Sequence, residues 1–175
     1  MEKPVSLRIK IKDLKEISYS TQITHEILDN FKEENVDMRL SFMVIGTPAD
    51  VTLELRLFLE YRYKKELGKP KTFFSLACST TFGFDNLDEN SELITLGENE
   101  SQIADPLMIR LLNISLGTLR GYAASKMAVL PINLIMPLVD PKKMIETAKK
   151  AGDIKETRLP AIKKRQVKKS NNSSN

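Results

Sequence analysis

Apolar and polar residues alternate with a period of two at the start of the chain, the pattern of a half-buried β-strand. Residues 5–11 place Val, Leu and Ile on one face and Ser, Arg and Lys on the other. The phase shifts across residues 14–19, so we expect a bend or bulge after Asp13. Residues 21–35 are mostly polar, with apolar residues at roughly helical steps, and indicate a surface loop or short helix.

The clearest alternation lies further along the chain. Residues 36–45 predict a second strand, closed by the turn signal Gly46-Thr47-Pro48. From Val51 to Tyr63 every second residue is apolar, and the residues between are polar except for Phe58. A period of two sustained over this length predicts a third strand and leaves little room for a helix. Phe58 then stands on the polar face, where an aromatic side chain needs a reason to be exposed.

A fourth strand is predicted from Thr72 to Phe84, which is rich in Phe and Thr. Residues 65–71 contain Gly68 and Pro70 and read as a hairpin connection. The last three strands are joined by short links, and a short link produces antiparallel pairing because a parallel return needs a longer crossover.

A long helix is predicted from residue 105, with Asp105 as N-cap and Pro106 at the first helical position. Its apolar residues form two stripes, one of Ile109, Leu112, Leu116, Leu119 and Ala123 and the other of Leu107, Leu111 and Ile114. One stripe can pack on the sheet. The remaining stripe would meet a second subunit or a ligand, or else be covered by an irregular loop of the same chain.

Two connections frame this helix. Residues 85–104 show no clear period, and we interpret them either as a flap over a binding groove or as a surface loop with a small hairpin at residues 92–96. Residues 126–137 are apolar and extended, interrupted by Pro131 and Pro137. A second, short and basic helix should begin at Asp140-Pro141 and end by Gly152.

Length and charge divide the chain unequally. A chain of 175 residues suits one core, so we expect one domain over residues 1–150 and a basic, disordered extension over residues 151–175. Residues 1–140 carry 16 Lys and Arg against 20 Asp and Glu, whereas residues 141–175 carry 11 against 3. A basic extension can attach to nucleic acid, to acidic protein or to an anionic membrane, or can simply be solvated.

Residues suited to covalent chemistry are scarce. The only histidine, His25, lies in a polar segment without metal-ligand partners, and the only cysteine, Cys78, lies within a predicted strand. Gly117 and Gly121 are spaced for close helix packing and form no phosphate loop. We therefore expect no metal, no cofactor and no enzymatic activity. With no leader and no long apolar run, we expect a cytoplasmic protein.

The order of several motifs resembles the SecB family of export chaperones. Leu14-Lys15-Glu16-Ile17-Ser18-Tyr19 is similar to the signature near the start of these proteins, where a lysine and an acid precede an apolar-Ser-aromatic triplet. The resemblance continues through the strands and the long helix to Leu130-Pro131-Ile132-Asn133-Leu134 and Met136-Pro137, and spans roughly residues 5–145.

The resemblance implies an α+β, SecB-like fold: a four-stranded antiparallel sheet with a long helix packed on one face, assembled as a dimer or a dimer of dimers. It also implies a chaperone that binds unfolded or precursor polypeptides in an apolar groove, with protein export as one setting for this activity. From position and expected exposure, our groove residues are Phe58, Phe82, Phe84, Leu87, Leu96, Ile103 and Leu130.

Other interpretations remain open. SecB export chaperones are acidic and reach the SecA motor through acidic sheet residues, whereas this chain has a basic extension and a polar sheet face of mixed sign, which disfavours SecA as a partner. Relatives of the fold serve as chaperones for antitoxins and need no acidic docking face. A nucleic-acid-associated protein would use the extension, at residues 163–165 and 168–169, on phosphates. A purely structural oligomer would bind no client.

Overall fold

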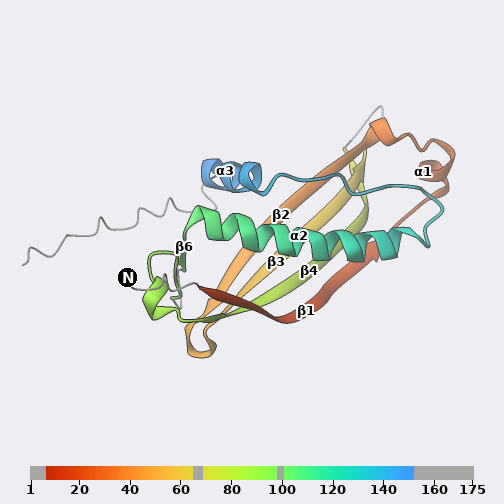
Figure 1. Ribbon diagram of the computed structural model, residues 1–175. Coiled ribbons are helices and arrows are strands. Elements are labelled where there is room, and N and C mark those ends of the chain that lie inside the picture. The colour runs from red at the N-terminus through yellow and green to blue at the C-terminus, as the bar shows by residue number, and fades with distance from the viewer. Residues whose placement is uncertain (1–6, 65–68, 98–100, 152–175) are drawn as a thin grey trace, which may run out of the picture.

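The computed structural model describes residues 7–64, 69–97 and 101–151. Its centre is a four-stranded antiparallel sheet in the order β1-β4-β3-β2 (Figure 1). The strands are β1 (Arg8–Thr21), β2 (Val36–Thr47), β3 (Thr52–Tyr63) and β4 (Lys71–Asp85). The predicted strands and their antiparallel pairing are confirmed. The sequence did not predict that β1 would pair with β4, which places β1 and β2 at the two edges of the sheet.

The two faces of the sheet differ in chemistry, and β3 shows the difference most clearly. Its odd-numbered residues from Leu53 to Tyr63 are buried, and its even-numbered residues are half-buried. We call the face that carries the odd-numbered residues of β3 the inner face. The register places Leu40 and Leu76 on either side of Leu59, so the apolar rows of three strands lie on this inner face.

Bulges interrupt the pairing of β1 with β4 at two points. The register shifts between Ile11 and Asp13 and again between Glu16 and Ser18. This confirms the bulge predicted from the phase change, and the two extra residues, Lys12 and Ile17, explain why β1 loses its strict alternation.

A third register shift lies in the pairing of β3 with β4, beside Tyr61. It brings both Phe73 and Phe74 into the core, where their rings lie 6.3 and 5.7 Å from the ring of Tyr61, centroid to centroid. Tyr19 of β1 meets Phe74 edge to face at 5.6 Å. These rings close one end of the core.

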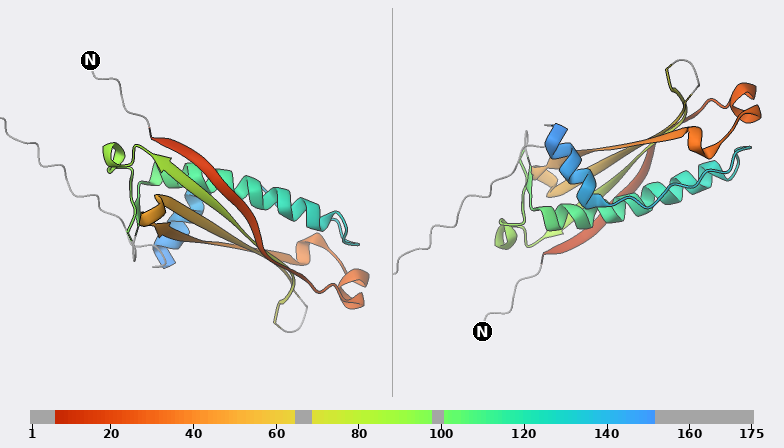
Figure 2. Two further views of the ribbon diagram at one scale, coloured as in Figure 1. Left: turned by 90° about the horizontal axis from the view of Figure 1, so that it is seen from below. Right: turned by 90° about the horizontal axis from the view of Figure 1, so that it is seen from above.

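Two helices follow the sheet, α2 (Asp105–Met127) and α3 (Pro141–Ala151), and α2 lies across the inner face (Figures 1 and 2). The long helix was predicted correctly, but its N-cap was not: Ala104 occupies that position and Asp105 is already helical. The Asp105 carboxylate instead binds the ammonium of Lys149, at 2.7 Å, and so ties the start of α2 to α3.

The remaining segments are short. Residues 21–35 contain the one-turn helix α1 (His25–Asp29) and the 3-10 turn η1 (Glu33–Asn35), as the pattern predicted. A 3-10 turn, η3 (Asp88–Asn90), and a small hairpin of β5 (Ile94–Thr95) and β6 (Gln102–Ile103) follow β4. A hairpin was one of the two alternatives for this connection, although it lies further along than residues 92–96. Ile94 and Ile103 are buried, so the hairpin is packed against the core.

Candidate functional site

The inner face of the sheet has two covers of different construction. One is α2, nine of whose residues are buried. The other is the extended segment of residues 128–140, here called the strap, which leaves the C-terminal end of α2 and returns beside the helix to α3 (Figures 1 and 2). The apolar stripes of the helix left open whether a second subunit, a ligand or an irregular segment of the chain would cover the remaining apolar surface. The strap, an irregular segment, provides part of that cover.

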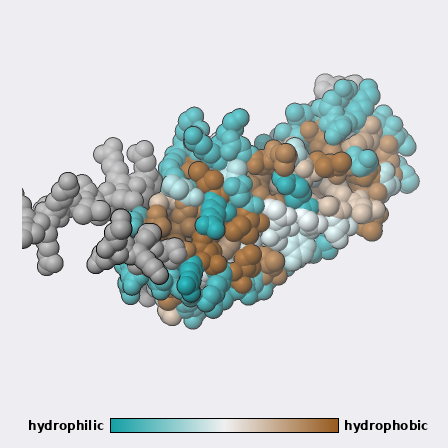
Figure 3. Space-filling model, in the orientation of Figure 1, coloured by the Kyte–Doolittle hydropathy of each residue, from teal (hydrophilic) through white to brown (hydrophobic). Residues whose placement is uncertain are grey.

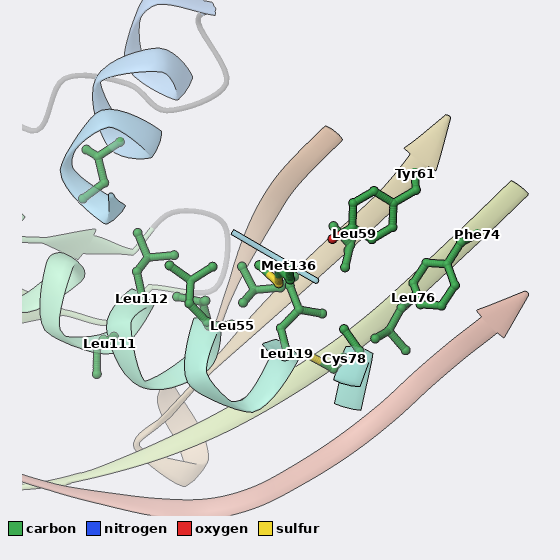
Figure 4. Close-up of a cluster of buried hydrophobic side chains, with 14 of the residues drawn as sticks. Leu55, Leu59, Tyr61, Phe74, Leu76, Cys78, Leu111, Leu112, Leu119 and Met136 are labelled. Atoms are coloured by element: carbon green, nitrogen blue, oxygen red, sulfur yellow. The ribbon is translucent and has the colours of Figure 1, made fainter. Parts of the chain in front are cut away.

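Side chains of the strap alternate between the core and the surface. Ile132, Leu134 and Met136 are 6%, 7% and 6% exposed and belong to the central hydrophobic cluster. Figure 4 shows Met136 among side chains from β3 and α2, including Leu59 and Leu119. The residues between them point outward, and Ile135 is 75% exposed.

The outward side chains of the strap are unusually apolar. Val129, Ile135 and Leu138 are 80%, 75% and 88% exposed, the largest values among the exposed large hydrophobic residues that the structure describes. Brown patches of hydrophobic residues interrupt the polar surface in the view that shows this side of the molecule (Figure 3). Scattered apolar residues are ordinary on protein surfaces, but a row of them on one extended segment is typical of a binding surface.

The strap also has free backbone groups. Within the described part of the chain, residues 131–139 make no backbone hydrogen bond, and the nearest lie at its two ends, from Leu130 N–H to the Met127 carbonyl and from Met144 N–H to the Asp140 carbonyl. Pro131 and Pro137 have no N–H to donate, which keeps the segment from joining the sheet as a strand.

Strand β2 offers a second apolar row at the edge of the sheet. Met38, Leu40, Phe42 and Val44 share the inner face with the buried residues of β3, yet each is only half-buried. The cause is their position, because β2 pairs with β3 on one side and has no strand on the other. An edge strand with unpaired backbone groups and apolar side chains can receive an extended chain.

The opposite edge, β1, has exposed apolar residues of its own. Ile11, Leu14 and Ile17 are exposed near the two bulges. The C-terminal end of α2 contacts this strand, because the Lys126 ammonium lies 2.9 Å from the Glu16 carboxylate and 4.8 Å from the ring centre of Tyr19. The oligomeric assembly expected from the sequence stays a prediction.

The predicted groove residues differ in how far they are buried. Phe82, Phe84 and Ile103 are 0%, 6% and 8% exposed and form part of the core, so the expected exposure of these three was wrong. Parity along a strand tells which residues share a face but does not tell whether another element covers it. The remaining four are half-buried: Phe58 lies on the outer face, and Leu87, Leu96 and Leu130 lie against the rim of the core.

Two parts of this surface were missed by sequence reasoning, namely the exposed residues of the strap and the half-buried row on β2. A signal for the strap did exist, since Ile132, Leu134 and Met136 repeat with a period of two between two prolines. No pattern, however, could show that the residues between them remain uncovered.

The outer face of the sheet carries charges that neutralise one another along the strands. An acid and a base two residues apart form an ion pair in β1 (Asp13 with Lys15, 2.7 Å) and in β3 (Glu54 with Arg56, 2.8 Å). The hydrogen bond from Arg56 lowers the pKa of Glu54, and that from Lys15 lowers the pKa of Asp13. Both carboxylates are therefore ionised and paired with a neighbouring base.

The Cys78 thiol and the Tyr61 ring are buried in the core. Burial raises the pKa of the Cys78 thiol to about 11 and the pKa of the Tyr61 hydroxyl to about 12, so both stay protonated and unreactive at neutral pH. Across the described ranges, no three His, Cys, Asp or Glu side chains converge as metal ligands. Within the same ranges, no helix is long and apolar enough to span a bilayer.

Comparison with known proteins gives a distant likeness in structure only. No family model matches the chain, and no curated protein matches it. Among solved structures, a SecB-like chaperone of Mycobacterium tuberculosis, in complex with a ChAD peptide from the HigA1 antitoxin, aligns over 75% of this chain and 92% of its own, with a TM-score of 0.45 and 12% identity. A protein of unknown function from Streptococcus agalactiae covers 75% of this chain and 100% of its own, with a TM-score of 0.29 and 12% identity.

Proposed function

We propose that this protein is a molecular chaperone that binds non-native polypeptide on the apolar surface formed by the strap and the β2 edge. The observation that carries the proposal is the exposed row of Val129, Ile135 and Leu138 on a segment with free backbone groups. An unfolded chain displays apolar side chains and unpaired amides, so a surface that offers both can capture many sequences with little specificity.

The surroundings of this surface fit a role in binding without chemistry. Leu130, next to Val129, and the inner row of β2 supply further half-buried aliphatic and aromatic side chains, and we propose that Leu87 and Leu96 near the β5–β6 hairpin add to this apolar surface. Delivery of clients to SecA would need an acidic docking surface, and the acids of the outer face described above are paired with bases. We therefore favour a client that needs no such delivery, for example an antitoxin, over export clients passed to SecA. The setting we propose is the cytoplasm.

The test is suppression of aggregation by the full chain, with insulin precipitated by reduction of its disulfides as the client and light scattering as the readout. Replacing Ile135 and Leu138 together by Ser should abolish most of the protection, because these side chains touch solvent and not the core. Replacing Ile11 and Leu14 together by Ser is the matched control, since both are exposed on β1 at the opposite edge of the sheet and the change should leave protection unchanged.

Equal protection by the wild type and the double variant would exclude the strap as the binding surface. No protection by the wild type would exclude the chaperone function. A third form, truncated after Gly152, separates this surface from the basic extension, which lies outside the described residues: protection lost only by truncation would favour the nucleic-acid or acidic-protein alternative.

A further inference from the structure

The strap is held in the molecule the way a bound peptide is held. Ile132, Leu134 and Met136 insert into the core at every second position, while Asn133 and Ile135 face solvent. No hydrogen bond within the described residues fixes its backbone from residue 131 to residue 139. Burial of three apolar side chains is thus its main attachment, in contrast to the strands, which are attached by ladders of hydrogen bonds.

The channel beneath the strap is apolar on every side. Its floor is the inner row of β3, which includes the fully buried Leu55 and Leu59. One wall is α2, whose Leu119 lies beside Met136 of the strap (Figure 4). The other side is the half-buried row of β2. Such a channel selects aliphatic side chains and rejects charged ones.

Geometry allows the strap to leave the channel while both of its ends stay in place. The helix α2 has 23 residues and is about 34 Å long at 1.5 Å per residue. The strap has 13 residues and a contour length of roughly 45 Å. Since it runs back along no more than the length of α2, its middle can rise by about 15 Å, more than the roughly 10 Å that separates packed layers.

From these observations we infer that the strap is the resident occupant of a client channel, and that a client first held by the exposed side chains of the strap then displaces it from the channel. The inference rests on the proposed function and specifies its substrate class: an extended polypeptide segment with aliphatic residues at positions i, i+2 and i+4. The strap competes at the high effective concentration of a tethered ligand, so only segments of this pattern replace it, and an empty channel is never exposed to solvent.

A fluorescein-labelled peptide with the sequence of residues 129–139 tests the inference by fluorescence anisotropy. Shortening a buried strap residue weakens the hold of the strap on the channel, and the strap is the competitor of the peptide. The Leu134→Ala protein should therefore bind the peptide at least tenfold more tightly than the wild type, which corresponds to about 1.4 kcal/mol. A peptide with Asn in place of Ile132, Leu134 and Met136 should not compete.

Two further variants keep the result decisive. Ile132→Val removes one methylene and preserves the fold, and it should bind the peptide two- to fivefold more tightly than the wild type. It replaces Leu134→Ala in the test if that variant fails to fold. Leu111→Ala makes the same truncation on the other stripe of α2, where Figure 4 shows Leu111 pointing away from Met136 of the strap, so it should give no gain. A gain of equal size in Leu111→Ala, or weaker peptide binding in either strap variant, would overturn the inference.

Failure of this inference is distinguishable from failure of the proposed function. If the wild type protects insulin from aggregation and the strap variants do not gain affinity, clients bind on top of the strap and do not replace it. If the wild type does not protect insulin and none of the strap variants binds the peptide, both proposals fail together.

Discussion

The helix α2 and the strap cover the same face of the same sheet, but they are attached in different ways. The helix satisfies its own backbone hydrogen bonds, buries nine residues and is tied to β1 through Lys126 and to α3 through Asp105. The strap buries three residues and leaves its backbone groups free. The difference teaches that a segment covering the core can be fully ordered and still be exchangeable. A second chain can reproduce the three apolar contacts of the strap far more easily than it can reproduce the contacts of a whole helix.

The largest expected effect compares truncations beneath the two covers. Leu119→Ala should reduce the free energy of unfolding by about 3–5 kcal/mol, because it opens a cavity between α2 and the sheet. Leu134→Ala should cost about 1–3 kcal/mol, since the strap can shift to fill the space. Urea denaturation followed by circular dichroism measures both values. Equal losses would show that the strap is as firmly built into the core as the helix.

The reactivity of Cys78 reports which cover opens. The thiol is buried beside Leu119 (Figure 4), and burial raises its pKa to about 11. A thiol-specific disulfide reagent at pH 8 should react with it slowly in the wild type and in Leu134→Ala, but many times faster in Leu119→Ala. Rapid reaction in Leu134→Ala would mean that loosening the strap also lifts the helix.

The same raised pKa makes stability depend on alkaline pH. The thiol has a pKa near 9.0 when unfolded and about 11 when folded, so folding favours its protonated form. Its contribution is complete below pH 9 and is lost as the pH rises toward 11, by about 2 kcal/mol. Urea titrations at pH 8 and pH 11 should show a smaller fall in Cys78→Ala than in the wild type. An identical fall in both proteins would show that the thiol is not the titrating group.

A change at Tyr61 tests whether its buried hydroxyl lowers the stability of the aromatic end of the core. The hydroxyl is buried and has no hydrogen-bond partner among the described residues. Tyr61→Phe removes that unsatisfied group and should stabilise the fold by about 1 kcal/mol, seen as a higher melting temperature. A destabilised variant would indicate that the hydroxyl has a partner in solution, with ordered water the first candidate.

The smallest expected effect concerns the tie between α2 and β1. Lys126→Met removes the ion pair with Glu16 and the contact with the ring of Tyr19, and should cost about 0.5–1 kcal/mol. A double-mutant cycle with Glu16→Gln isolates the ionic part, which should shrink at high salt. A coupling near zero would leave apolar burial as the sole difference between the helix and the strap.

Much of the architecture followed from the sequence alone. Strict alternation from residue 51 to residue 63 determined β3 and its two faces, and the phase change after Asp13 determined a bulge in β1. The proline and the apolar stripes determined α2. Each of these is a local effect, in which the period of the side chains must match the period of the backbone.

Only the tertiary structure decided what each apolar residue touches. Phe82 and Phe84 have the same alternation as an exposed strand would have, yet both are buried in the core, whereas Val129, Ile135 and Leu138 are as apolar and remain uncovered. The pairing of β1 with β4 likewise joins segments far apart along the chain. Burial depends on which other segments arrive in space, and no period along one segment contains that information.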